Sequence, residues 1–86
     1  MEIVILDSAY KHGVTKQGIL FCLLHFHSDI VIADPPPKRL FVGFDHNGNP
    51  LEIIAVEDEE NYRLVVIHAM KLRKQFYQFL SNEGTL

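Results

Sequence analysis

Two side chains able to support phosphate chemistry stand close together near the end of the sequence. His68 ends the apolar, β-branched run Val65–Ile67, and Arg73 follows it five residues later. An imidazole can move a proton near neutral pH, and a guanidinium can neutralise a phosphate. RNA cleavage needs a base for the 2′-hydroxyl, an acid for the leaving oxygen and positive charge at the phosphorus. This pattern therefore indicates a site for phosphodiester cleavage.

A hairpin in the middle of the chain fixes which other side chains can join that site. Asn47 and Gly48 favour a two-residue type I′ turn, because both positions need positive φ. Such a turn pairs Phe44 with Leu51 and sets the alternation of both strands. One apolar face then holds these two residues with Leu40, Val42, Ile53 and Ala55. The other face receives Arg39, Phe41, Gly43, Asp45, Glu52, Ile54 and Val56.

The length of the acidic loop decides where His68 points. A five-residue loop, Glu57–Asn61, puts His68 on the same face as Arg39 and Glu52, whereas a loop shorter by one residue turns it to the other face. We prefer five residues, because this collects polar side chains instead of burying them singly. We therefore predict that His68, Arg39 and Arg73 converge on one concave catalytic site. Glu52 lies behind them and orients one of them by an ion pair, with a role as general base as its alternative.

Basic and aromatic residues around these positions are candidates for RNA binding. They are Lys11, His12, Lys38, Lys71, Lys74 and Tyr77. Simpler interpretations stay open: Lys11 and His12 as a solvated turn, and Arg39 as a cation that protects an edge strand. Arg73 and Lys74 can simply favour the helix and its solubility. Likewise, His68 can be a half-buried histidine that bonds to the backbone.

Length and composition favour one domain, residues 1–86, in the cytoplasm. The single Cys22 cannot form an internal disulfide, and no apolar stretch approaches the ~20 residues that cross a bilayer. The formal net charge is −3, to which the acidic run Glu57–Glu60 contributes strongly, so binding of RNA must depend on local cations. Cys22, His25 and His27 do not complete a metal-ligand spacing. We expect no metal and no cofactor.

The order of elements predicts an α+β domain. A one-turn helix in residues 6–15 precedes a second helix in 15–26, which Thr15 can cap. Strands follow in 28–33, on both sides of the hairpin 38–57, and in 62–70. Residues 71–80 have the spacing of an amphipathic helix. The prediction is two N-terminal helices, a four-stranded antiparallel meander and a C-terminal helix.

Three segments in this order resemble the BrnT group of the RelE-like toxin superfamily. They are KHGV (Lys11–Val14), the arginine that opens the hairpin (Arg39) and VIHAMKLR (Val66–Arg73), and the similarity runs from about residue 7 to 80. The resemblance implies a RelE-like fold and an endoribonuclease toxin of a type II toxin–antitoxin system, acting on free or ribosome-bound RNA to inhibit translation. It also implies a cognate antitoxin that carries a DNA-binding domain and neutralises the toxin.

A non-catalytic binding protein of the same fold is the alternative function, acting on a protein target as ParE-like inhibitors do, or as a regulator. The acidic balance of the chain favours it. The apolar helix around Ile19–Phe26 and the strand Ser28–Ala33 carry more hydrophobic surface than one sheet face can cover. We therefore expect a protein interface there, in a homodimer or with an antitoxin.

Overall fold

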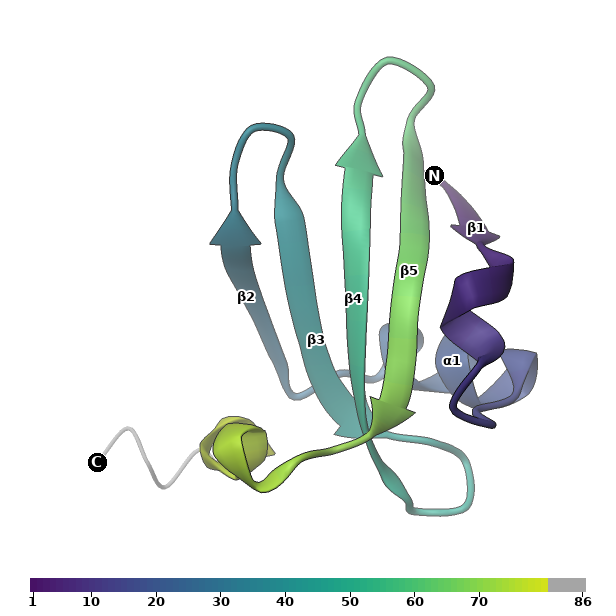
Figure 1. Cartoon of the computed structure of the whole chain (residues 1–86), viewed down its shortest axis with the longest axis vertical. Helices are drawn as coiled ribbons and strands as arrows, with labels where there is room; N and C mark the ends of the chain where they lie inside the picture. Colours follow the sequence, from purple (N-terminus) through teal and green to yellow (C-terminus); the bar gives the residue numbers. More distant parts are fainter. Residues whose placement is uncertain (81–86) are drawn as a thin grey trace.

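Five strands form one mixed sheet in the computed structural model, which describes residues 1–80 (Figure 1). The spatial order is β1-β5-β4-β3-β2. Neighbours from β2 to β5 are antiparallel, whereas β1 runs parallel to β5. The strands are β1 (Glu2–Ile5), β2 (Ser28–Ala33), β3 (Lys38–Phe44), β4 (Pro50–Asp58) and β5 (Arg63–Lys71).

The first strand corrects the predicted topology. Ile3 pairs with Leu64 and Ile5 with Val66, so the sheet has five strands and one parallel pair. The prediction of a four-stranded antiparallel meander with a RelE-like arrangement is therefore wrong. The run Glu2–Ile5 is β-branched but only four residues long. Its partner lies some sixty residues away, so neither a hairpin turn nor a sustained alternation marks it as a strand.

The helices also differ from the prediction at the end of the chain. The segment η1 (Asp7–Tyr10) is one 3₁₀ turn, α1 (Lys16–Leu24) is the only α-helix of the described residues, and η2 (Lys74–Leu80) is again 3₁₀. The amphipathic α-helix predicted for residues 71–80 is wrong. Strand β5 continues to Lys71, and the backbone N–H of Leu72 donates to Pro50 O at 3.0 Å, which extends sheet pairing into that segment.

Two apolar layers cover the two faces of the sheet. Helix α1, capped by Thr15 Oγ1 accepting from Gly18 N at 3.0 Å, lies behind the sheet in Figure 1 and buries Ile19, Cys22 and Leu23 against β3 and β4. Segment η2 packs on the opposite face against Leu40, Val42 and Leu72, and contributes Phe76, Phe79 and Leu80. The sheet is thus a central layer, and each face has its own environment.

Close packing makes Cys22 unreactive in the folded protein. Its side chain is fully buried, and burial, with a smaller contribution from Asp45, raises the pKa of the thiol to about 12. Only the thiolate reacts with disulfide reagents. At pH 8 we expect no modification of native protein over minutes and one modified thiol per chain in denaturant, measured by absorbance of the released thiolate. Rapid modification of the native protein would contradict this packing.

The hairpin adopts a register one residue away from the predicted one. Phe44 pairs with Pro50 rather than Leu51, and Val42 pairs with Glu52. The carboxylate of Asp45 accepts hydrogen bonds from the backbone N–H groups of Asn47 and Asn49 at 2.9 and 2.8 Å. Within residues 45–49, only Gly48 has positive φ, at 82°. The backbone N–H of Asp45 also donates to Asn49 O at 2.9 Å, so a three-residue loop, residues 46–48, stabilised by the Asp45 side chain, replaces the type I′ turn.

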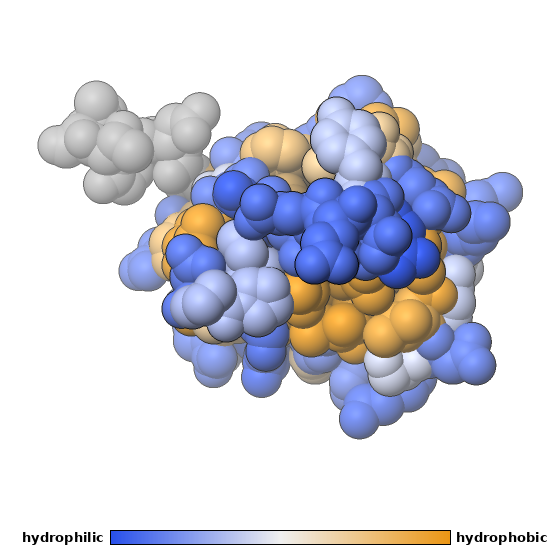
Figure 2. All heavy atoms as spheres, turned by 90° about the horizontal axis from the view of Figure 1, so that it is seen from above, coloured by the Kyte–Doolittle hydropathy of each residue, from blue (hydrophilic) through white to orange (hydrophobic). Residues whose placement is uncertain are grey.

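Apolar side chains are exposed to solvent at the end of the sheet opposite the β3–β4 hairpin. Figure 2 looks down on that end and shows an apolar area beside a hydrophilic ridge. A cavity of about 370 Å³ there is lined by Met1, Ile3, Leu23 and Phe26 among others, and Met1 and Phe26 are 64% and 42% exposed. No helix within residues 1–80 has the length and apolar character needed to span a membrane.

Candidate functional site

A buried carboxylate organises the candidate site. Glu52 lies in β4, on the η2 side of the sheet, and its side chain is fully buried. Its oxygens accept hydrogen bonds from Arg73 Nε at 3.0 and 3.1 Å, from Arg73 Nη2 at 2.6 Å and from the Arg73 backbone N–H at 3.0 Å. His68 Nε2 lies 3.0 Å from Oε2. Both oxygens are fully engaged, as a buried carboxylate requires.

These bonds keep Glu52 ionised despite its burial. Burial is the largest single effect on its pKa and raises it. The side-chain and backbone hydrogen bonds from Arg73, that from His68 and the charge of Arg73 together outweigh burial, so the pKa lies below the usual 4.5. The same pairing with Glu52 raises the pKa of Arg73. The pair is therefore an ion pair with bidentate geometry at neutral pH.

An ionised Glu52 also fixes the tautomer of His68. A carboxylate without a proton can only accept, so Nε2 of His68 must carry the hydrogen of their 3.0 Å contact. In the neutral imidazole, the lone pair then resides on Nδ1. Nδ1 has no hydrogen-bond partner among residues 1–80, and the side chain is 23% exposed. His68 can therefore accept a proton from a ligand while Glu52 holds its ring in place.

A second imidazole, from a different part of the chain, lies against His68. The ring centroids of His12 and His68 are 5.6 Å apart, and the rings meet edge to face. After β1, the chain continues along the edge of β5: Leu6 N donates to Val66 O at 3.0 Å and Ser8 Oγ donates to Ile67 O at 3.1 Å. This path carries η1 and the following turn alongside β5, and so brings His12 to His68.

Arg73 presents a partly exposed cation that shares Oε2 of Glu52 with His68. Its side chain is 45% exposed, and the guanidinium carbon lies 5.4 Å from the ring centroid of Phe76. Glu52 binds Nε and Nη2, while Nη1 makes no hydrogen bond within residues 1–80. One edge of the guanidinium thus anchors the side chain, and the remaining nitrogen can donate to an anion.

Arg39 does not belong to this cluster, contrary to the prediction. It pairs with Ala55 and lies on the α1 side of the sheet, where its guanidinium contacts Asp29 at 2.9 Å and Glu57 at 3.4 Å. The shift of register in the hairpin accounts for this, because a slip of one residue moves a whole strand to the opposite face. The predicted convergence of His68, Arg39 and Arg73 is therefore wrong for Arg39.

The position of His68 beside Glu52 agrees with the prediction, but for a different reason. Asp58 pairs with Arg63, so the β4–β5 loop has four residues rather than five. Taken alone, this shorter loop would place His68 on the face opposite Glu52. A β-bulge follows: Ala55 pairs with Val66 and Ile54 with His68, leaving Ile67 as the extra residue. The bulge reverses the alternation once more, and His68 returns to the face that carries Glu52.

The predicted RNA-binding residues divide into two groups. Lys11 and His12 follow η1, Lys71 ends β5, and Lys74 and Tyr77 lie in the exposed parts of η2. These segments lie at the end of the sheet where β4 begins and β5 ends, which is also the end that carries Glu52. Lys38, in contrast, pairs with Val56 at the opposite end of the sheet. The structure therefore separates Lys38 from the other candidate cations.

One feature of the site was missed in the sequence. From the segment KHGV, His12 was predicted only as an RNA-binding residue. Its imidazole lies beside His68, and two imidazoles can act as an acid–base pair. The only sequence signal for this pairing was Glu2–Ile5, since β1 brings the following residues to β5.

Within residues 1–80, no group of three or more His, Cys, Asp or Glu side chains is placed to hold a metal ion. No protein-family model, curated protein or solved structure matches the chain.

Proposed function

We propose that this protein is a metal-independent endoribonuclease whose reacting groups are His68, His12 and Arg73. The observation that carries the proposal is the contact of two imidazoles, 5.6 Å between centroids, one of which shares Oε2 of Glu52 with the guanidinium of Arg73. One imidazole without its proton and one with it form an acid–base pair, and the cation stabilises the charge that develops on the phosphate.

The reaction assigns a different task to each group. Nδ1 of His68 takes the proton of the 2′-hydroxyl, whose oxygen attacks the phosphorus. The bond from phosphorus to the 5′-oxygen breaks, and protonated His12 gives its proton to that oxygen. Arg73 Nη1 donates to a non-bridging oxygen throughout. Glu52 is a positioning residue, because it touches His68 and Arg73 but is itself buried.

The resemblance of the KHGV and VIHAMKLR segments to BrnT-type toxins supports a biological role for this activity. We propose a toxin of a type II toxin–antitoxin pair that inhibits translation in the cytoplasm until an antitoxin with a DNA-binding domain neutralises it. This role rests on the sequence resemblance and on the chemistry of the cluster.

Cleavage of a single-stranded RNA in the presence of EDTA tests the chemistry. Purified protein should give fragments that end in a 2′,3′-cyclic phosphate and begin with a 5′-hydroxyl. An RNA with one 2′-deoxynucleotide at the cleavage site is the matched control and should stay intact there. Intact RNA after long incubation at high enzyme concentration, or cleavage that EDTA abolishes, would reject the proposal.

Salt dependence reports how many cations bind the RNA. Lys11, Lys71, Arg73 and Lys74 lie at the site's end of the sheet, whereas Lys38 and Arg39 do not. With about 0.7 counterions released per phosphate contact for single strands, the slope of log affinity against log salt should be no steeper than roughly −3. Fluorescence anisotropy at several salt concentrations measures it, and Lys38→Ala should leave the slope unchanged. A much steeper slope would place RNA on another surface.

A second candidate function, a non-catalytic protein-binding role, is favoured by the exposed apolar residues. Leu24 is 73% exposed, and Val31 and Ile32 on the edge strand β2 are 50% and 48% exposed. An edge strand with exposed apolar side chains is typical of surfaces that bind protein. Inactive protein that nonetheless forms a stable complex with a co-expressed partner would favour this role over RNA cleavage.

A further inference from the structure

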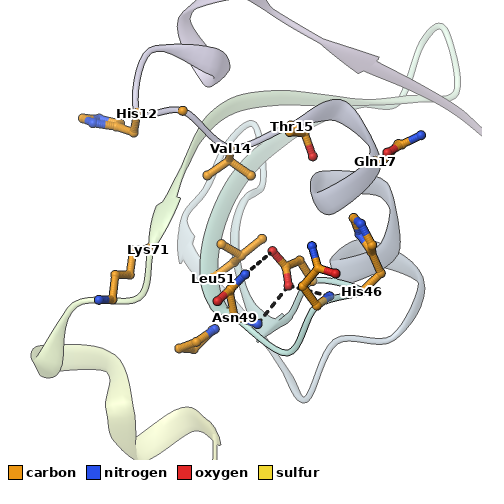
Figure 3. A pocket seen from close by; sticks show the side chains of 12 residues that line it. His12, Val14, Thr15, Gln17, His46, Asn49, Leu51 and Lys71 are labelled. Atoms are coloured by element: carbon orange, nitrogen blue, oxygen red, sulfur yellow. Dashed lines mark hydrogen bonds between the residues drawn. The ribbon is translucent and has the colours of Figure 1, made fainter.

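A polar cavity adjoins the catalytic cluster and shares His12 with it. The cavity has a volume of about 440 Å³ and lies between the turn after η1, the start of α1, the β3–β4 loop and the end of β5. His12 and Lys71 stand on one side of it in Figure 3, and Gln17 and His46 stand on the other. His12 also contacts His68, so a ligand in the cavity would lie next to the reacting groups.

The cavity walls are held in place by contacts within the protein. Asp45 accepts from the backbone of Asn47 and Asn49 and from Asn49 Nδ2 at 3.1 Å, which fixes the β3–β4 loop. Gly18 lets this loop approach α1: a Cβ at Gly18 would lie 3.4 Å from Asp45 Cβ and 3.2 Å from Thr15 Oγ1. Helix and loop therefore pack directly against each other, and the cavity is formed in advance of ligand binding.

The lining combines an apolar floor with free amides. Val14, Pro50 and Leu51 offer apolar surface, and Asn49 Nδ2 is already bonded to Asp45. The side-chain amides of Gln17 and Asn47 make no hydrogen bond within residues 1–80, and both residues are exposed. An amide offers a donor and an acceptor side by side, which is the pattern on the edge of a nucleobase.

Charge at the cavity argues against an isolated anion as its ligand. Lys71 is the only lysine or arginine that lines it, and the carboxylate of Asp45 lines it as well. A base is neutral, whereas the phosphate attached to it is negative. Lys71 lines the cavity and pairs with Leu51 on the α1 side of the sheet, so it can contact the phosphate of a nucleotide whose base lies in the cavity.

We propose that this cavity receives one unpaired nucleobase of the RNA, that of the nucleotide adjoining the cleaved phosphate, and that Gln17 and Asn47 read its edge. The inference rests on the proposed function for the identity of the polymer. It makes single-stranded RNA the substrate, because a base can enter a cavity only when it is unpaired. It also makes cleavage selective for the base at one position.

Mononucleotide binding tests the cavity independently of cleavage. The four nucleoside 5′-monophosphates are titrated into ¹⁵N-labelled protein, and amide shifts are followed by NMR. We expect one base to shift the signals of Val14, Gln17 and Asn49 most. The combined variant Gln17→Ala/Asn47→Ala should lower the affinity of the protein for that nucleotide about fivefold or more. A matched control, Gln75→Ala/Gln78→Ala, removes two exposed amides of η2 that do not line the cavity and should bind like wild type.

The outcomes separate this inference from the proposed function. NMR shifts that are confined to the neighbourhood of Arg73 and equal for all four nucleotides would reject the proposal that the cavity binds a base, whether or not RNA is cleaved. Cleavage by wild type with no preference for any base would overturn it too. Nucleotide shifts at the cavity without any cleavage of RNA would support base binding and reject the endoribonuclease. Cleavage whose base preference is lost in Gln17→Ala/Asn47→Ala would support both.

Discussion

RNA cleavage should fall by about 10²-fold or more when His68 is replaced with alanine, while the fold is retained. His68 Nδ1 is the proton acceptor in the proposed reaction, and the ring is partly exposed, so its removal opens no large cavity in the core. The rate constant under single-turnover conditions measures the loss, and circular dichroism checks the fold. His25→Ala is the matched control, because His25 is exposed and its tilted ring lies against Phe21, 4.5 Å between centroids.

The same experiment on His12 distinguishes a pair of catalytic groups from a single one. If His12 is the acid, His12→Ala should lower the cleavage rate constant by a similar factor. The double variant should cleave only slightly more slowly than either single variant, since the effects of substituting groups that act as a unit are not additive. A substrate with a better leaving group than the 5′-oxygen should rescue His12→Ala and not His68→Ala. Cleavage by His68→Ala at the wild-type rate would reject the mechanism.

Local patterns predicted several elements of this fold. Thr15 as a cap and the apolar run after it predicted the helix that α1 forms, and the turn residues around Asn47 predicted the β3–β4 hairpin. The α+β class follows from these. Strand β1 was not predictable in this way, because its stability comes from a parallel partner distant in sequence and from the buried face they share.

Register decided how much of the site could be predicted. Placing Glu52 beside His68 was correct, but it depended on a four-residue loop and a bulge at Ile67 that compensate each other. Placing Arg39 there failed because the Asp45 side chain, rather than Asn47 and Gly48, controls the hairpin loop. Each of these is a shift of one residue, and each changes the sheet face of every side chain beyond it. Hydrophobic alternation alone did not resolve them, since both faces of this sheet are apolar.

The buried ion pair gives the second large expected effect. Glu52→Ala should lower the free energy of unfolding by about 2–4 kcal/mol, because it removes the charge-assisted bonds to Arg73 and His68 and leaves a void next to Val42. For a domain of this size, that corresponds to a fall in melting temperature of roughly 10–20 °C. Thermal unfolding monitored by circular dichroism measures it. Glu60→Gln, an exposed change in the acidic loop, is the control and should alter the melting temperature little.

The dependence of stability on acid pH tests whether the charge of Glu52 causes the loss of stability in variants of this residue. The pKa of Glu52 is lower in the folded protein than its usual 4.5, so the unfolded chain binds the proton more readily. The stabilisation is therefore complete above about pH 5 and is lost as the pH falls through the folded-state pKa. The difference in unfolding free energy between wild type and Glu52→Gln should be largest at pH 7 and shrink steadily below pH 4.5, measured by urea unfolding at each pH. A difference that stays constant from pH 7 to pH 3 would mean that shape or packing at this position, rather than the ion pair with Arg73, accounts for the loss.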